Sequence, residues 1–307
     1  MPEQVGPLWA LVALVLLGAF TFAGGALNGA LTTGGGGGLR GVLRPVSEAA
    51  RLLRQRRRTL LKADRLLWRI GVLGLVLAAV LMVAVVPLGS AVLLDLDVGV
   101  VWFNAMDVAV WAFVWLTGWG ANSALSLVGG YRFLALALAY ELPLMFAIAT
   151  PAVAAGSLNV SVIAAAQQGV WFGVWMPVAL VIYLGALVAF SVSGPFAAPL
   201  GTDIAGGVRA ELSGVDRLTF HAGQYALLAA GAAFSVPMFL GGGAGPLLPG
   251  WAWTLVKIAV VLAALVWVRR RIPALRPDRF MEVGWLVLLP AALVQLFVVA
   301  VIVVGRG

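Results

Sequence analysis

Three ionisable residues lie within stretches of sequence that are otherwise apolar. Glu141 lies in the stretch from Gly118 to Ile148, Asp107 lies in WFNAMDVAVW, and Lys257 lies in GWAWTLVKIAVV. A charged side chain at the centre of a bilayer costs roughly 2.5–3.5 kcal/mol on insertion scales, so it usually faces a protein interior or a wet cavity. Groups of this kind hold and release protons or bind ions. We therefore predict that these residues form the functional part of the chain.

The composition indicates that helices in a membrane must position these residues. Of the 307 residues, 63% are apolar and 10% are charged, with a mean hydropathy of +1.06, whereas about 25% of residues in soluble domains are charged. The apolar segments have about 20 residues, the length of a helix that crosses the hydrocarbon core. We predict an all-α polytopic membrane protein, one membrane domain over residues 1–307, with eight transmembrane helices at about 7–28, 67–90, 98–118, 129–155, 169–190, 220–241, 250–270 and 284–305.

The predicted helices place the two carboxylates near mid-depth. At 1.5 Å per residue, Asp107 lies about 12 Å from the start of its helix and Glu141 about 18 Å from the start of the next one. Two carboxylates at one level can exchange a proton through water, and Pro143 can kink the backbone beside Glu141 to make room. Alternatively, Asp107 makes a helix-packing hydrogen bond to Asn104 or to a tryptophan.

Two basic residues each have two interpretations. Lys257 lies roughly 9 Å below Trp251; it is either a proton-relay or counter-ion group, or a side chain that reaches the membrane surface. Arg132, near the start of the fourth span, either faces the same cavity as Glu141 or anchors its helix at the interface.

Redox centres are expected in other subunits. The sequence has no cysteine and a single histidine, His221, which excludes disulfides and cysteine-bound iron–sulfur clusters within this chain and leaves no pair of histidines for a haem. We therefore predict no metal site and no catalytic residue in this chain.

The distribution of arginine and lysine predicts the orientation. Most of the basic residues lie in the connections after the first, fifth and seventh spans, whereas the other connections carry only Asp95 and Asp97 or no charge. By the positive-inside rule, the basic connections are cytoplasmic and both termini lie outside. The arginine- and alanine-rich composition, with only two lysines, is typical of a GC-rich bacterial genome, so we expect a bacterial cytoplasmic membrane. The net charge of +8 then favours anionic lipids or an acidic partner at the cytoplasmic face and, without a nucleic-acid motif, no nucleic acid.

Two cytoplasmic elements are predicted between spans. Residues 39–58 include apolar positions at i, i+3, i+4 and i+7 from Val46, with Pro45 suited to the start of a helix, so an amphipathic helix is expected on the membrane surface. It is either an anchor or a docking collar for a soluble partner. Residues 191–219 form a long connection that we expect to be ordered and to face a partner.

Three blocks of sequence resemble the H-type membrane subunits of bacterial NADH:quinone oxidoreductase, respiratory complex I, a family that includes anchor subunits of membrane-bound hydrogenases. They are GWGANSALSLVGGYRFLALALAYELPL from Gly118, Pro195–Phe196 followed by AELSG from Ala210, and WVRRRIPALRPDRFMEVGWLVLLPAAL from Trp267. The resemblance implies a membrane subunit that meets a soluble iron–sulfur arm, forms a quinone passage and links quinone chemistry to antiporter-like subunits through a chain of carboxylates.

The resemblance also implies roles for individual residues. Glu141 matches the family's buried glutamate, Arg132 its nearby arginine, Lys257 its intramembrane lysine, and Glu211 the glutamate before Ser-Gly. The expected proton path therefore comprises Glu141, Asp107, Lys257, Glu211 and Asp203. The expected quinone passage or soluble-arm contact comprises Arg132, Glu48, Arg51, Phe196, Arg209, Gln224 and Tyr225.

Several carboxylates of the family pattern are absent. Residues 191–194 replace Glu-Thr-Asn-Arg, residues 197–200 replace Asp and Pro-Glu after PF, and Gln224–Tyr225 replaces Glu-Tyr. Either protons take another route, in which Asp107 is the substitute, or the quinone function is weakened or lost.

The leading hypothesis is a proton-path and anchoring subunit of a complex I-like assembly, which binds no cofactor of its own apart from quinone and is not an enzyme alone. Its partners are the iron–sulfur and quinone-site subunits, antiporter-like subunits and anionic lipids. The alternatives are a quinone-independent anchor in a hydrogenase-like or ferredoxin-linked complex, and a stand-alone ion transporter.

Overall fold

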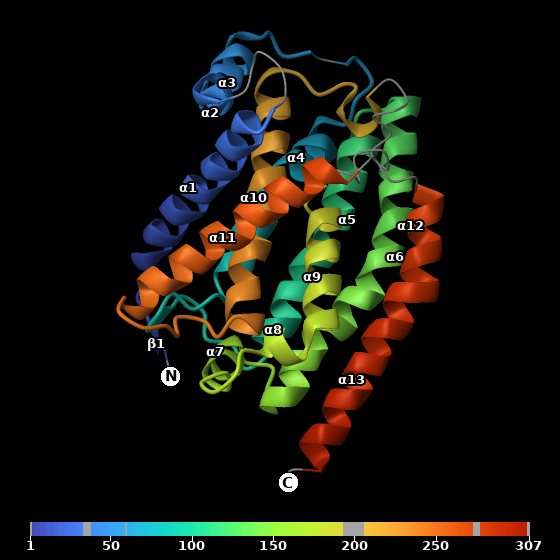
Figure 1. The fold of residues 1–307 in the computed structure, drawn as a ribbon. Helices are drawn as coiled ribbons and strands as arrows, with labels where there is room; N and C mark the ends of the chain where they lie inside the picture. Colours follow the sequence, from blue (N-terminus) through green and yellow to red (C-terminus); the bar gives the residue numbers. More distant parts are fainter. Residues whose placement is uncertain (1, 33–37, 59, 193–205, 273–276, 306–307) are drawn as a thin grey trace.

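The computed structural model describes residues 2–32, 38–58, 60–192, 206–272 and 277–305. Most of them form helices (Figure 1). The elements are β1 (Glu3–Gln4), α1 (Trp9–Ala30), α2 (Leu39–Val42), α3 (Arg44–Arg54), α4 (Arg65–Val83), β2 (Ala91–Val92), α5 (Gly99–Gly120), α6 (Ala124–Ala155), α7 (Val160–Ala165), α8 (Phe172–Trp175), α9 (Pro177–Phe190), η3 (Gly207–Arg209), α10 (Gly214–Phe239), α11 (Gly250–Arg271), α12 (Pro277–Val283), η4 (Gly284–Leu288) and α13 (Leu289–Val304).

The predicted all-α membrane fold is confirmed, with a difference in the fifth span. Seven helices within the described residues are long and apolar enough to cross a membrane: α1, α4, α5, α6, α10, α11 and the continuous run from Asp278 to Val304. The fifth predicted span is instead divided into α8 and the 14-residue α9. Pro177 causes this break because the residue before a proline disfavours helical geometry, and Met176 accordingly has φ −121° and ψ 50°.

Several helix ends differ from the predicted ones for local reasons. α4 begins at Arg65 because the Asp64 carboxylate accepts hydrogen bonds from the backbone N–H groups of Leu66 and Leu67, a normal N-terminal cap. α6 begins at Ala124, five residues earlier than expected. α10 begins at Gly214, so the final part of the connection predicted over 191–219 is helical.

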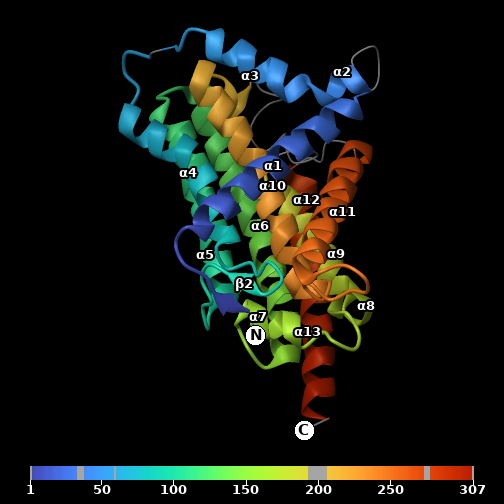
Figure 2. The same ribbon diagram turned by 90° about the vertical axis from the view of Figure 1, so that its left-hand side faces the viewer.

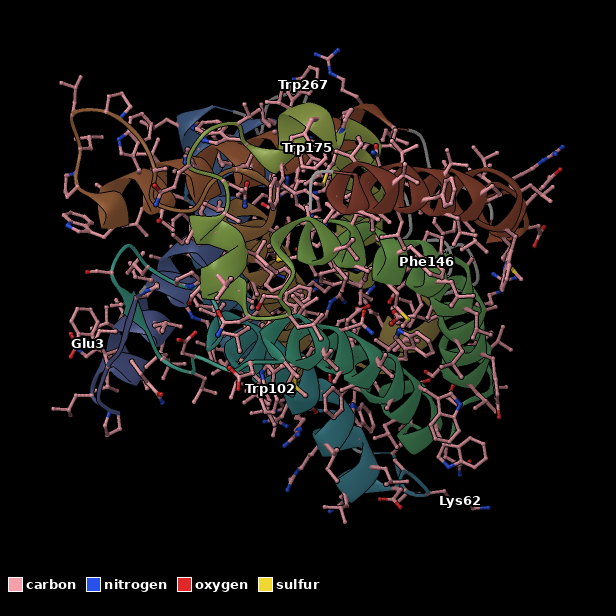
Figure 3. All side chains as sticks on the ribbon, turned by 90° about the horizontal axis from the view of Figure 1, so that it is seen from below. Glu3, Lys62, Trp102, Phe146, Trp175 and Trp267 are labelled. Atoms are coloured by element: carbon pink, nitrogen blue, oxygen red, sulfur yellow. The ribbon has the colours of Figure 1, made fainter. Side chains whose placement is uncertain are left out.

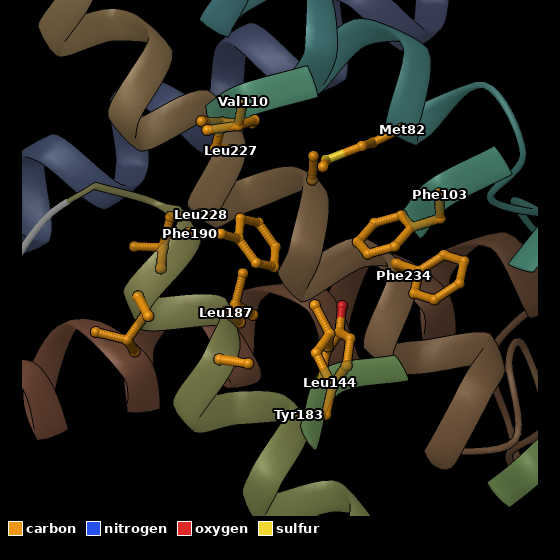
Figure 4. Packing of buried hydrophobic residues seen from close by; sticks show 14 of the residues in the cluster. Met82, Phe103, Val110, Leu144, Tyr183, Leu187, Phe190, Leu227, Leu228 and Phe234 are labelled. Carbon is orange, nitrogen blue, oxygen red and sulfur yellow. The ribbon is translucent and has the colours of Figure 1, made fainter. Parts of the chain in front are cut away.

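The bundle is organised around α10. In its membrane-crossing window 89% of residues are buried, against 11% in the last span. α10 packs against α1, α4, α9 and α11, while α13 lies along the outside of α6 (Figure 3). An aromatic cluster fills the centre: Phe103 of α5 stacks on Phe234 of α10 with ring centroids 3.7 Å apart, and Tyr183 of α9 lies beside them (Figure 4).

The two ends of the bundle differ in charge. α1 begins and α13 ends at the same end, opposite α2 and α3 (Figure 1). We call the end that carries α2, α3 and the arginine-rich connections the basic end. There α3 lies across the ends of the helices (Figure 2). Its Leu52 is buried, whereas Val46 and Leu53 are exposed, so α3 packs on the bundle through Leu52 and the stripe that we predict to lie on the membrane surface does not pack there.

Candidate functional site

α5 and α6 bring Asp107 and Glu141 together inside the bundle. Asp107 is fully buried and Glu141 is 5% exposed. The amide Nδ2 of Asn104, one turn before Asp107 on α5, donates a hydrogen bond to Oε1 of Glu141 at 2.8 Å. The two carboxyl groups also interact electrostatically with each other and with Tyr140. The site therefore comes from two adjacent antiparallel helices, and two of its members were predicted from the sequence.

The carboxyl pair has more acceptors than the surrounding residues satisfy. Both oxygens of Asp107, Oε2 of Glu141 and the hydroxyl of Tyr140 are buried without a hydrogen-bond partner among the described residues, and so is Nε1 of Trp111. Buried polar groups are nearly always hydrogen-bonded, and two carboxyl groups held together satisfy each other only when they share a proton. The arrangement suits a group that takes up and releases a proton.

Close helix contacts hold the pair in place. A side chain at Gly118 would lie 2.5 Å from the backbone oxygen of Ser126, so glycine is needed for α5 and α6 to approach this closely. Pro143, which is buried in α6, cannot donate to the carbonyl of Ala139. Gly284 packs directly against that carbonyl, where a Cβ atom would lie 2.6 Å from the oxygen. Pro143, two residues after Glu141, therefore leaves without its helical donor the same carbonyl group against which the last span packs closely.

A separate cavity of about 580 Å³ opens at the basic end between α1, α3 and α10. We call it the basic-end cavity. Its polar lining includes Glu48, His221, Tyr225, Arg44 and Arg270, and its apolar lining includes Phe22, Pro45, Leu52 and Leu218. Three glycines of α1, at positions 18, 25 and 29, also line it. A volume of this size with a mixed lining is typical of a small-molecule site.

Two residues predicted for the quinone passage or soluble-arm contact form an ion pair on α3. Arg51 binds both carboxylate oxygens of Glu48, at 2.9 and 2.5 Å. The Arg51 hydrogen bond holds the pKa of Glu48 below its ordinary value. Both side chains are about half exposed, so this acid stays ionised and hydrated at neutral pH.

On α10, the predicted pair Gln224–Tyr225 lies next to His221. Nδ1 of His221 is 3.0 Å from Oε1 of Gln224, whose Nε2 donates to the carbonyl of Val192. Tyr225 lines the basic-end cavity, and the guanidinium of Arg269 lies 5.1 Å from the centre of its ring. This part of α10 therefore faces the cavity with one ring nitrogen and one phenol.

The remaining predicted residues at the basic end are spread over several elements. Arg132 is half-buried on α6, about 14 Å along the helix from Glu141. Arg209 lies in η3, where burial and the neighbouring Arg217 lower its pKa, and Glu211 follows in the turn before α10. Phe196 and Asp203 lie outside the described residues.

Lys257 makes different contacts from Asp107 and Glu141, the predicted proton-path residues inside the bundle. Its Nζ donates hydrogen bonds to the carbonyl oxygens of Leu240, Gly242 and Ala244 at 2.7–2.9 Å. The ammonium also lies 4.3 Å from the ring centre of Trp171. All three donors of the amine are satisfied by the segment that follows α10, so these contacts do not join Lys257 to the carboxyl pair.

Sequence reasoning missed several residues of these sites. Asn104 was one of two alternative hydrogen-bond partners considered for Asp107, together with a tryptophan, but its amide donates to Glu141. Tyr140 was not predicted, and the tryptophan considered for Asp107 was not assigned to a position. Trp111 stands one helical turn from Asp107, which is a spacing that could have indicated it. Arg270 was missed because its hydrogen bonds to Asn28, Leu31 and Thr32 join the seventh span to the first. Among the described residues, no three acidic or histidine side chains gather closely enough to hold a metal ion.

Comparison with known proteins gives a consistent result. Residues 8–300 match the model of a family described as NADH dehydrogenase. An H subunit of the NADH-quinone oxidoreductase of Geobacter sulfurreducens is 34% identical over 270 residues, which cover 84% of this chain and 82% of that protein. The H subunit of the Anoxybacillus flavithermus NADH-quinone oxidoreductase is 32% identical over 97% of both chains. An H subunit from Rhodopseudomonas palustris is 33% identical over 97% of this chain and 95% of its own. The resemblance seen in the sequence is thereby confirmed: this chain is a bacterial membrane protein that belongs to the NADH dehydrogenase family, among the homologues of the H-type membrane subunits of complex I.

Proposed function

We propose that this chain anchors the soluble iron–sulfur arm of a complex I-like assembly, forms part of a quinone passage and contributes to redox-coupled proton translocation. The names of its relatives connect NADH and quinone, and we extend that connection to this chain. The observation that carries the proton part is the buried pair of Asp107 and Glu141, which has three oxygens without hydrogen-bond partners among the described residues.

In this proposal the pair holds a shared proton. The Asn104 amide donates to one oxygen of Glu141 and so favours its ionised form. Asp107, with no donor supplied to either oxygen within the described residues, is the better place for the proton. Transfer between the two carboxyl groups needs little movement because they already interact. Asp107 would thereby substitute for the carboxylates that are absent from residues 191–200.

The basic-end cavity supports the quinone part. A quinone carbonyl requires a donor, and the phenol of Tyr225 supplies one at this cavity. His221, whose Nδ1 donates to Oε1 of Gln224, keeps Nε2 as an acceptor for a hydroxyl of the reduced form. The apolar lining by Phe22, Pro45, Leu52 and Leu218 suits an apolar tail. The quinone would receive electrons from a partner protein, since this chain has no cysteine to hold a cluster.

The basic end is the proposed cytoplasmic face, with both termini on the outer side. The arginines of α2, α3 and the end of α11 all lie there, as expected if positive residues stay inside. The soluble arm would dock on α3 and η3, where Arg51 and Arg209 lie, near the start of α6.

The test is Glu141→Gln in the intact assembly, reconstituted in vesicles. We expect an assembled complex that still transfers electrons to quinone but loses most of its proton pumping, because the amide cannot carry the proton. Glu282→Gln, an exposed acid on α12, is the matched control and should pump normally.

Normal pumping by the Glu141 variant would reject the proton path. A separate titration of the unmodified assembly with quinone tests the passage. If electron transfer is insensitive to quinone while the chain remains assembled with iron–sulfur subunits, the quinone-independent anchor becomes the better assignment.

A further inference from the structure

A second, smaller cavity at the basic end is not used by the proposed function. It has a volume of about 70 Å³ and lies at the start of α4. We call it the α4 cavity. Its lining consists of Arg57, Arg58, Leu60, Ala63, Arg65, Trp68, Arg69 and Asp216, and it shares none of these residues with the basic-end cavity.

The α4 cavity carries an uncompensated positive charge. Arg57 is neutralised by Asp216: its Nε donates to Oδ2 at 2.7 Å, and its terminal nitrogen binds the other oxygen. Within the described part of the chain, no salt bridge joins Arg58, Arg65 or Arg69 to an acid. Three guanidinium groups with no acidic partner there remain at the cavity.

The protein fixes this arrangement and adds a buried donor. The backbone N–H of Arg58 donates to Oγ of Ser213 at 2.7 Å, which ties the segment before α4 to the start of α10. Trp68 is only 6% exposed, and its indole Nε1 has no hydrogen-bond partner among the described residues. Trp68 therefore adds to the cavity lining a side chain whose indole N–H is buried and unpaired within the described residues.

An apolar stripe continues from the cavity along α4. Leu66, Ile70, Leu73 and Leu77 follow one another at intervals of three or four residues, so they share one side of the helix. They are 68%, 42%, 58% and 53% exposed, respectively. Arg69 and Leu73 are one turn apart, so the charged and apolar parts adjoin.

We propose that the α4 cavity binds the phosphate group of an anionic phospholipid whose acyl chains lie along the stripe from Leu66 to Leu77. Guanidinium groups bind phosphate through paired, charge-assisted hydrogen bonds, and basic pockets at a membrane surface recognise anionic headgroups. Tryptophan is suited to the same level of the bilayer. A free phosphate would use only the charged half of this surface, whereas a phospholipid uses both halves.

The experiment compares lipid retention by the intact assembly, purified in detergent with phosphatidylglycerol and analysed by native mass spectrometry. The test variant is R58Q/R65Q/R69Q. The control R40Q/R54Q/R56Q removes the same charge from exposed positions of α2, α3 and the segment after it. We expect phosphatidylglycerol binding to weaken roughly fivefold for each arginine removed from the cavity, which corresponds to about 1 kcal/mol each, with little change in the control. Equal retention by both variants would overturn the proposal.

A second arm distinguishes the lipid from a free phosphate and uses the unmodified assembly, so it does not depend on the folding of a variant. Phosphatidylglycerols with long and short acyl chains are compared, each with and without an excess of inorganic phosphate. Tighter binding of the long-chain lipid, with little displacement by phosphate, supports the acyl-chain contact. Equal binding of both lipids, or complete displacement by inorganic phosphate, would reject it.

Discussion

Lys257 and the Asp107–Glu141 pair are buried ionisable groups in the same bundle, but their surroundings differ. The ammonium of Lys257 has an acceptor for each of its three donors and lies against the Trp171 ring. The two carboxyl groups receive one hydrogen bond, from Asn104, and three of their oxygens have none among the described residues.

The difference indicates which buried charge supports the fold and which one can change its protonation. A cation whose donors all meet carbonyl oxygens stabilises one backbone arrangement, here the segment after α10 that contains Gly241 and Gly242. A carboxyl pair with unsatisfied oxygens gains a hydrogen bond with each proton that it shares. This contrast favours a structural role for Lys257, which sequence reasoning placed on the proton path, and a proton-carrying role for the pair.

The largest effect on stability is expected from Lys257→Met. The substitution keeps most of the side-chain volume but leaves three carbonyl oxygens without their donor, and a buried polar group left unsatisfied costs roughly 1–3 kcal/mol. The thermal denaturation midpoint of the purified assembly should fall clearly, while the ratio of protons pumped to electrons transferred in the surviving complex stays the same. Lys62→Met, on an exposed residue, is the control. A Lys257 variant that is stable but does not pump protons would instead assign Lys257 to the proton path.

The carboxyl pair should show the opposite behaviour. Asp107→Asn and Glu141→Gln each remove a buried acid while keeping its shape. We expect the free energy of unfolding to change by less than about 1 kcal/mol or to rise, because a buried carboxyl group with unsatisfied oxygens is replaced by a neutral amide. The double variant gives the coupling between the two positions, which contacting residues show at about 0.5–3 kcal/mol. Thermal denaturation of the single and double variants measures it. Strictly additive changes would mean that the two acids do not interact.

The sequence was sufficient to predict the class of fold and to single out the two acids that α5 and α6 bring together. Charge in a span is costly, so Asp107 and Glu141 were conspicuous, and regular helical rise placed them at similar depth. Helix ends were less predictable because single local contacts determine them. The cap at Asp64 and the proline at position 177 shifted or divided elements that hydropathy alone outlines as continuous segments.

Contacts between distant segments could not be predicted. Nothing local to Lys257 indicates that its partners are the carbonyl groups 13 to 17 residues earlier in the chain. The ion pair between Arg57 and Asp216 joins residues 159 positions apart. The packing of α3, α4 and α10 determines which distant residues meet, and that packing cannot be inferred from a single sequence.

The role of the basic-end cavity can be tested by a substitution that reduces its volume. Gly18 lines the cavity, and a Cβ at this position would meet nothing within 4 Å. We therefore expect Gly18→Trp to fold and to fill part of the cavity, raising the KM for quinone several-fold with a smaller change in kcat. Gly185→Trp, equally open but on α9, is the control. An unchanged KM would remove this cavity from the quinone passage and leave the carboxyl pair as the remaining basis for the proposed function.

The smallest effect is expected at Glu48, the exposed counterpart of Glu141. Its pKa is lowered in the folded protein by the Arg51 hydrogen bond, so its contribution to stability is present above the unfolded-state pKa and is lost as pH falls through the lowered value. Exposed ion pairs contribute little, so Glu48→Gln should only slightly flatten the acid side of the stability curve. Denaturation midpoints measured from neutral to acidic pH, beside Glu282→Gln of the exposed Arg279–Glu282 pair, test this expectation. If Glu48→Gln abolished proton pumping as completely as Glu141→Gln, the exposed, ion-paired acid would be as necessary for pumping as the buried one. Burial would then not distinguish the acid that carries the proton.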